Sequence, residues 1–146
     1  MKNITLNELR DLLDEAGVRH SKKDDVLFAF LDADEDFGHD VLVLFTIEGD
    51  GARIRAIAGR SEFQAPCGNR LQALEFCNAW NDDKVVPRAY LDEKGKFRLD
   101  LSLYTDVDLD ASYVKENFIN LFMATSWQFF KAAGQEFEGS ALSLKK

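Results

Sequence analysis

The sequence predicts a single α+β domain over residues 1–146, with its elements in the order helix, three strands, helix, two strands, long helix. In three segments, apolar residues recur every three or four positions, as they do on one face of a helix. Between these segments, apolar residues either alternate with polar ones or form short runs rich in β-branched and aromatic residues, which is typical of strands. No linker, repeat or low-complexity tract divides the chain, and its length suits one hydrophobic core.

The first helix is expected to begin after Thr5 and to end at Gly17. Thr5 and Glu8 have the spacing of a capping box, in which each side chain binds the backbone N–H of the other residue. Ile4 and Leu9 are placed to form a hydrophobic staple across the same helix start. A glycine such as Gly17 commonly follows the last helical residue.

Three strands are expected over residues 26–31, 41–47 and 53–57. The first two are nearly continuous apolar runs, which indicates that both faces of the sheet are at least partly covered. The glycines of residues 49–51 predict a tight hairpin turn. Residues 53–57 then alternate between arginine and apolar side chains, as a half-exposed strand does.

The second helix is expected to have Asn69 as its N-cap, with Gln72 at the capping-box position, and to end near Asn81. A hairpin of strands 85–91 and 97–104 follows. In the latter strand, apolar residues at odd positions alternate with polar residues at even positions, which is the clearest strand pattern in the chain.

Asn78 and Asn81 lie near the end of this second helix. Asparagine is unfavourable inside a helix because its side chain competes for backbone hydrogen bonds. We expect the two side chains to cap the helix and to hold the following turn, with a recognition role as the alternative.

The last helix is expected from Asp110 to about Ala133, with Gly134 as its stop. At 100° per residue its apolar residues cover half of the circumference or more, which is wider than the stripe that packs on one core. The sheet can bury one face of this helix. The second face needs another cover, which could be the first helix, a second subunit or a client protein. The predicted interface residues on this face are Ile119, Met123, Trp127 and Phe130.

Residues 74–81, 87–92 and 96–101, together with the order of the elements, resemble the YbjN-like family of bacterial sensory-transduction regulators. This family pairs an asparagine-containing helix end with a hairpin and a phenylalanine-rich C-terminal helix. The resemblance implies a bent antiparallel sheet with packed helices, similar to type III secretion chaperones. It implies no catalytic residues.

The chain carries a formal net charge of −8. A negative protein is repelled by the phosphates of nucleic acids and by anionic lipid surfaces. No apolar run reaches the length of a membrane span, and residues 1–14 lack the apolar core of a signal peptide. We therefore expect a cytoplasmic protein with no nucleic-acid or membrane partner.

Carboxylates at alternating positions in residues 32–40 resemble the calcium loop of an EF-hand. The match fails because Gly38 falls one position late, Val43 stands where a bidentate glutamate is needed, and the flanking segments predict strands. We expect a solvated acidic hairpin loop, with weak calcium binding as the alternative.

The remaining reactive residues predict no enzyme. Cys67 and Cys77 fit neither a zinc ligand set nor a redox motif, and we expect free thiols. His20 and His39 stand in no spacing that builds a metal site or a catalytic triad, and His20 is expected at the surface. The glycine fingerprints of nucleotide-binding loops do not occur. The sequence thus predicts no catalytic residues, no cofactor and no metal.

The predicted function is a non-catalytic protein-binding module, a regulatory adaptor or chaperone-like protein that acts through its C-terminal helix and a sheet face. A homodimer is expected, because large apolar surfaces are rare on monomers and tend to mark interaction sites. Two alternatives stay open. One is a dedicated type III secretion chaperone, and the other is a small-molecule sensor domain, since a bent sheet under helices can hold a cavity.

Overall fold

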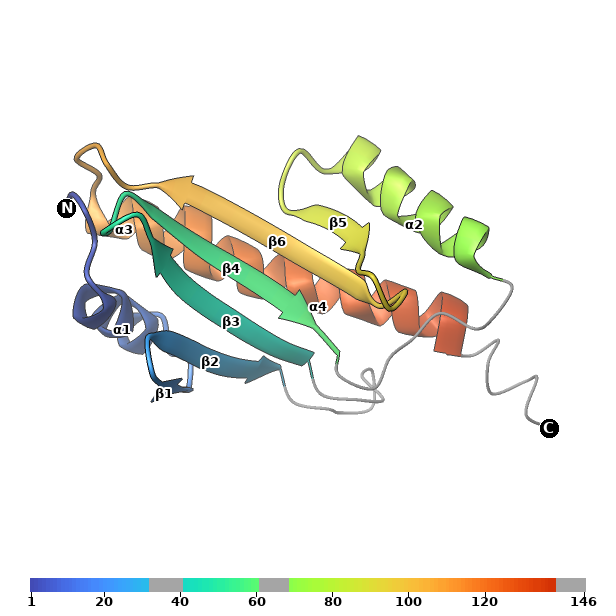
Figure 1. The fold of residues 1–146 in the computed structure, drawn as a ribbon, viewed down its shortest axis with the longest axis horizontal. Coiled ribbons are helices and arrows are strands. Elements are labelled where there is room, and N and C mark those ends of the chain that lie inside the picture. The colour runs from blue at the N-terminus through green and yellow to red at the C-terminus, as the bar shows by residue number, and fades with distance from the viewer. Residues whose placement is uncertain (32–40, 61–68, 139–146) are drawn as a thin grey trace.

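A computed structural model of the chain describes residues 1–31, 41–60 and 69–138 (Figure 1). Within these residues, six strands form one antiparallel sheet in the order β1-β2-β3-β4-β6-β5. The strands are β1 (His20–Lys23), β2 (Val26–Leu31), β3 (Val41–Glu48), β4 (Arg53–Gly59), β5 (Arg88–Leu91) and β6 (Phe97–Tyr104). The helical segments are α1 (Leu6–Glu15), α2 (Arg70–Asp83), α3 (Ala111–Val114), η1 (Lys115–Asn120), α4 (Leu121–Ala133) and η2 (Gly134–Glu138). The predicted α+β class is confirmed.

The start of α1 has the predicted capping box. The Thr5 N–H donates to Glu8 Oε1 at 3.0 Å, and the Glu8 N–H donates to Thr5 Oγ1 at 3.2 Å. These two bonds satisfy backbone donors that a helix start otherwise leaves unpaired. Ile4 and Leu9, the predicted staple, are both buried.

The structure has one strand more than the sequence predicted before α2. β1 pairs with β2 at an edge of the sheet, with Ser21 opposite Phe28. Its side chains show no apolar alternation because three of its four residues are exposed, so backbone pairing alone defines it. His20 begins this strand and is only 7% exposed at its side chain, with Nδ1 3.0 Å from the Val18 carbonyl oxygen. The expected surface position of His20 is wrong.

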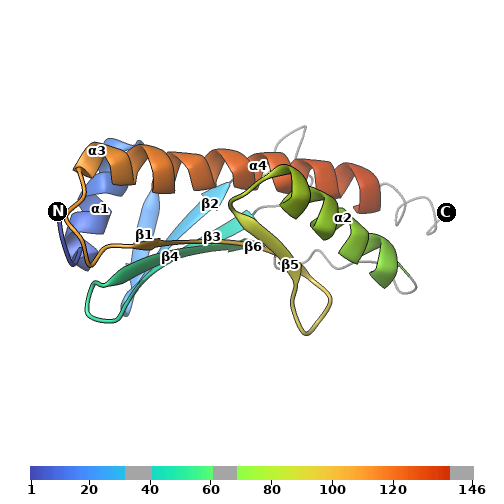
Figure 2. The same ribbon diagram turned by 90° about the horizontal axis from the view of Figure 1, so that it is seen from above.

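The long C-terminal helix consists of α3, η1, α4 and η2 and runs across one face of the twisted sheet (Figure 2). It starts after Asp110, as predicted, but it does not stop at Gly134. The helical segment continues to residue 138 because Phe137 is buried there, with its ring centroid 5.2 Å from that of Phe97. The free energy gained by burying this aromatic ring is larger than the preference of glycine for ending a helix.

The core at the C-terminal end of the long helix is a cluster of aromatic rings. Neighbouring ring centroids lie 5.0–5.8 Å apart and most pairs are edge-on or tilted, which is the favoured geometry. The cluster joins α2, β6 and the long helix and consists of Phe76, Trp80, Phe97, Phe129, Phe130 and Phe137. At the other end, α1 packs against η1.

Two of the four predicted interface residues lie in this core. Ile119 and Phe130 have no exposed surface, so the prediction that they form a surface is wrong. The helical wheel assumed 100° per residue, but residues 115–120 form a π-type segment with wider turns, which shifts the phase of the side chains. In addition, α1 and α2 flank the helix and cover more of it than the sheet alone could (Figure 2).

The second helix and the hairpin follow the prediction with two differences. Asn69 is the N-cap of α2, but its side chain makes no capping bond, and the Gln72 side chain donates to Glu136 Oε1 at 3.3 Å instead of closing a capping box. Strand β5 begins at Arg88 rather than at residue 85. The β6 alternation is confirmed, with Phe97, Leu99 and Leu101 buried.

The turn between β3 and β4 supports the start of α1, and we expect it to tolerate no side chain at Gly51. Gly51 has φ +90°, and a Cβ there would lie 2.7 Å from the Asn3 carbonyl carbon, whereas Gly17 has φ +74° with nothing within 4 Å. Gly17→Ala should cost about 1 kcal/mol from the left-handed backbone alone. Gly51→Ala should lower the free energy of unfolding by about 3 kcal/mol, because the clash of the new Cβ with the Asn3 backbone adds to the cost of the left-handed conformation. Chemical denaturation of both variants checks this, and equal costs would contradict it.

Candidate protein-binding face of the sheet

The described residues gather no side chains that suggest catalysis or metal binding. Cys77 is a free, buried thiol, and burial raises its pKa to about 11, which disfavours the reactive thiolate. No three His, Cys, Asp or Glu side chains of the described ranges come together as metal ligands. Cys67, His39 and the acidic residues 32–40 lie outside the described residues. Across those same described ranges, no helix has both the length and the apolar character to cross a membrane.

The β5 edge of the sheet is closed by side chains of α2. Asn81 accepts a hydrogen bond from the Ala89 N–H at 2.8 Å and donates one to the Ala89 carbonyl oxygen at 2.9 Å. Trp80 Nε1–H donates to the Pro87 carbonyl oxygen at 3.1 Å. These side chains take the place of a further strand, and they confirm that Asn81 ties the helix end to the next segment. Asn78 is exposed.

The β1 edge is short and carries Lys22 and Lys23, both exposed. Lysines on a short edge strand discourage pairing with another chain, because a second strand would have to bring its backbone and side chains against two charges. Together with the closed β5 edge, this leaves the faces of the sheet as the surfaces that a partner could use.

The helices of the structure all lie on one side of the sheet, and we call the opposite side the open face (Figure 2). The strand register arranges its side chains in rows that cross the strands. One row runs from Phe28 through Leu44, Ile57 and Asp100 to Arg88. Because side chains alternate between the two faces along each strand, the rows two residues away also point to the open face, and the rows between them point to the helices.

One half of the open face, over β2, β3 and β4, is apolar. Its side chains are partly or largely exposed, and Phe30 is 56% exposed. An exposed group of this kind on a single face is typical of an interaction site. We call it the apolar strip, and its members are Val26, Phe28, Phe30, Leu42, Leu44 and Ile57.

The other half, over β4, β6 and β5, carries arginines around a carboxylate. Asp100 Oδ2 accepts a hydrogen bond from Arg55 Nη2 at 3.1 Å and one from Arg88 Nη2 at 2.9 Å. Arg53 pairs with Glu48, whose Oε1 also lies 4.0 Å from Arg55 Nη1. These groups border a depression of about 370 Å³ lined by Arg53, Arg55, Arg88, Asp100 and Ser102.

A fourth arginine, Arg98, extends the charged half toward the β5–β6 turn. Its side chain crosses Gly59, where a Cβ would lie 2.1 Å from Arg98 Nη1. Arg98 Nη2 is 3.1 Å from Asp92 Oδ2. Burial alone would raise the pKa of Asp92, but the backbone N–H groups of Lys96 and Lys94 and the charge of Arg98 lower it on balance.

The open face has the opposite charge to the rest of the chain. Counting its strand positions and Asp92, five cationic side chains face three carboxylates, which leaves a net charge of +2. The whole chain carries −8. The cations are Lys23, Arg53, Arg55, Arg88 and Arg98, and the carboxylates are Glu48, Asp92 and Asp100.

The model of the YbjN family, described as "Putative bacterial sensory transduction regulator", matches residues 5–134. The chain belongs to the YbjN family. The resemblance found in the sequence is thereby confirmed, and the family is described as a regulator rather than as an enzyme. No protein with a curated description matches the sequence.

A solved structure of the same family has a similar fold. The crystal structure of YbjN from E. coli, titled "a putative transcription regulator", superposes with a TM-score of 0.70 at 16% identity. The superposition covers 92% of this chain and 96% of the E. coli chain. At this identity the likeness establishes the fold that the two family members share.

Met123 and Trp127, the other two predicted interface residues, are partly exposed on the long helix. Met123 lines a depression of about 480 Å³ together with Phe28 and Phe30 of the apolar strip. Trp127 lies under Lys131, whose Nζ is 4.5 Å from the ring centroid. The structure thus places Met123 on the helix side of the sheet near its β1 edge, where the depression reaches around to the open face, while Ile119 and Phe130 are in the core.

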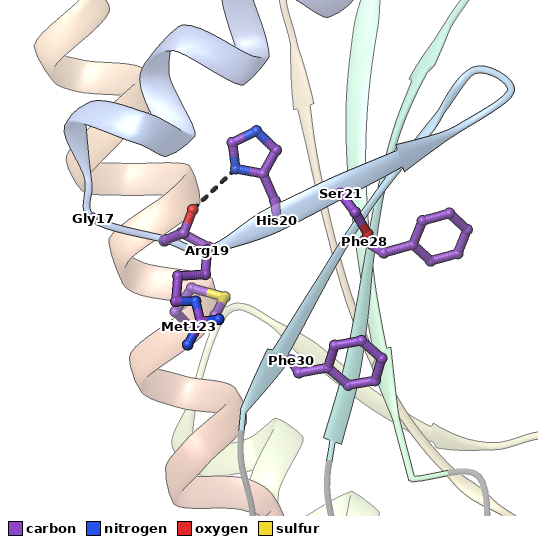
Figure 3. Close-up of a pocket in the computed structure, with 8 residues that line it drawn as sticks. Gly17, Arg19, His20, Ser21, Phe28, Phe30 and Met123 are labelled. Carbon is purple, nitrogen blue, oxygen red and sulfur yellow. Dashed lines mark hydrogen bonds between the residues drawn. The ribbon is translucent and has the colours of Figure 1, made fainter.

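The same depression is a candidate for a small-molecule site, but its side chains diverge. Figure 3 shows Phe28 and Phe30 on one side of the strands, with Arg19 and Met123 on the other side. His20 turns back to the Val18 carbonyl oxygen. Ligand pockets need a few polar groups that converge on one volume. This one instead continues the open face around the edge of the sheet.

The asparagine that closes the β5 edge gives a direct test. Asn81→Ala removes two hydrogen bonds to Ala89 and should destabilise the fold by about 1–2 kcal/mol. Asn78→Ala is the matched control, since Asn78 is exposed on the same helix, and it should change stability by less than about 0.5 kcal/mol. Chemical denaturation measures both. Equal stabilities of the two variants would mean that the edge is not held by Asn81.

Proposed function

We propose that this member of the YbjN family is a non-catalytic regulatory module of the bacterial cytoplasm that binds another protein through the open face of its sheet. The observation that carries the proposal is the apolar strip, which no described helix covers and in which Phe30 is 56% exposed. The family description of a sensory transduction regulator supports a regulatory role.

The occupant that fits this face is an extended segment of a partner protein that carries apolar side chains. The apolar strip and Met123 offer it a broad contact that reaches around the β1 edge of the sheet. A second copy of the chain fits less well, because two open faces of net charge +2 would repel each other. Aromatic and methionine side chains suit a surface that adapts to a flexible segment.

Two other functions would use neighbouring surfaces. A dedicated type III secretion chaperone would hold a partly unfolded client segment, and the identity of the bound protein separates a secreted client from a regulatory partner. A small-molecule sensor would use the depression at Gly17, Phe30 and Met123. A compound bound there would shift the signals of these residues in solution without any partner protein.

The proposed function predicts where a partner can be cross-linked in living bacteria. A photo-reactive benzoylphenylalanine in place of Phe30 on the open face should form covalent adducts with one recurring protein, identified by mass spectrometry. The same group in place of Tyr113, which is 47% exposed on α3, should give none. Leu44→Ser, in the apolar strip, should reduce the adduct at position 30 by several-fold. Adducts at Tyr113 only, or at neither site, would overturn the proposal.

A homodimer is a separate prediction that concerns the partly exposed helix residues. If two copies pair through Met123 and Trp127, light scattering of the purified chain should give twice the chain mass. Trp127→Glu should then restore the monomer mass, whereas Gln128→Glu, at an exposed position on the same helix, should leave the dimer intact. A wild-type chain that stays monomeric at high concentration would contradict the homodimer.

A further inference from the structure

We infer that the arginine cluster on the open face, formed by Arg53, Arg55 and Arg88 around Asp100, is a carboxylate-binding subsite for an acidic residue of the partner segment. This inference rests on the proposed function and adds to it the chemistry of the partner. The depression that these residues line, about 370 Å³ in volume, opens on the same face as the apolar strip.

The cluster is held in place by groups of the protein itself. The Asp100 side chain is only 12% exposed, and its Oδ2 lies 3.1 Å from Arg55 Nη2 and 2.9 Å from Arg88 Nη2. These two contacts hold both guanidinium groups in place. The side chain of Arg88 is 63% exposed and also stacks on Tyr90, with Cζ 4.8 Å from the ring centroid. A guanidinium carries more N–H donors than one carboxylate oxygen accepts, so donors of both arginines are left for an incoming anion.

The charge of the cluster selects the kind of anion. Three arginines face the two carboxylates Glu48 and Asp100, which leaves a net charge of +1. One partner carboxylate neutralises this charge. A phosphate group, with close to two negative charges, would exceed it. Ser102, opposite Arg55 in the strand register, adds a hydroxyl at the border of the same depression.

The rows of the sheet set the spacing between the apolar and acidic residues of the partner. Leu44 and Arg88 lie in one row, separated by the strands β4 and β6. Neighbouring strands are about 4.8 Å apart, so three steps span about 14 Å. An extended segment covers this distance in about four residues. The partner segment should therefore carry apolar residues about four positions away from an Asp or Glu.

The test uses two blocked synthetic peptides, Leu-Leu-Ser-Ser-Ser-Glu and the same peptide with Gln at its end. Their binding to the isotope-labelled chain is followed by the NMR signals of the arginine Nε–H groups and of the strand amides. The Glu peptide should shift the signals of Arg55 and Arg88 and bind roughly tenfold more tightly than the Gln peptide. The advantage should shrink at high salt, because ions screen the pairing of exposed charges.

Variants assign this preference to the cluster. Arg88→Gln and Arg55→Gln should each remove the difference between the two peptides. Arg10→Gln, at an exposed arginine of α1, should keep it. Because Arg88 is largely exposed, its substitution should not unfold the chain, and the amide spectrum of each variant reports on its fold.

The outcomes that overturn the inference differ from those that overturn the proposed function. Equal binding of the Glu and Gln peptides, with shifts along the apolar strip only, would remove the carboxylate subsite and leave the docking face intact. Binding of a phosphoserine peptide in preference to the Glu peptide would replace the carboxylate by a phosphate. The absence of any open-face shift with both peptides would also overturn the inference, and cross-linking at Phe30 would then decide the docking face separately.

Discussion

The structure depends on burial of the phenylalanine-rich long helix against one face of the sheet. Phe118, Phe122 and Phe129 have no exposed surface, and burial of each large aromatic side chain contributes about 1.5–3 kcal/mol. Rings of this helix, of α2 and of β6 form one aromatic cluster, which is the largest group of ring contacts in the described chain. Because the helices α1 and α2 pack beside the same helix, all helical cover is drawn to one side of the sheet.

The open face follows from that distribution of cover. A sheet has two faces and two edges. Here the helices cover one face, and Asn81 binds the backbone of the β5 edge. Exposed lysines on the short strand β1 disfavour strand pairing at the other edge. The remaining face combines an apolar strip with arginines held by Asp100, on a chain that is otherwise strongly acidic. This contrast is the physical basis for a partner that is both apolar and negatively charged. It also places the proposed binding on the rigid strands rather than on loops, which favours a defined geometry.

The sequence anticipated the fold better than the site. The capping box at Thr5, the alternation of residues 97–104 and the family resemblance led to the correct class and to most element bounds. Strand β1 escaped prediction because an exposed edge strand shows no apolar pattern. Of the four interface residues predicted on the long helix, Met123 and Trp127 are partly exposed, whereas Ile119 and Phe130 are buried. The helical wheel could not predict this, because it does not show which neighbouring helices cover a face.

Three of the four open-face arginines, Arg53, Arg55 and Arg98, were visible in the sequence as the exposed half of a strand pattern at residues 53–57 and 97–104. By itself the sequence determined that these positions alternate, because side-chain direction along a strand follows from backbone geometry alone. Only the tertiary structure decided that Arg55 and Arg88 meet at Asp100, and that Leu44 and Ile57 continue the same row. These contacts depend on the strand order, in which β6 lies between β4 and β5. Strand order is set by long-range packing of the whole chain rather than by local sequence pattern.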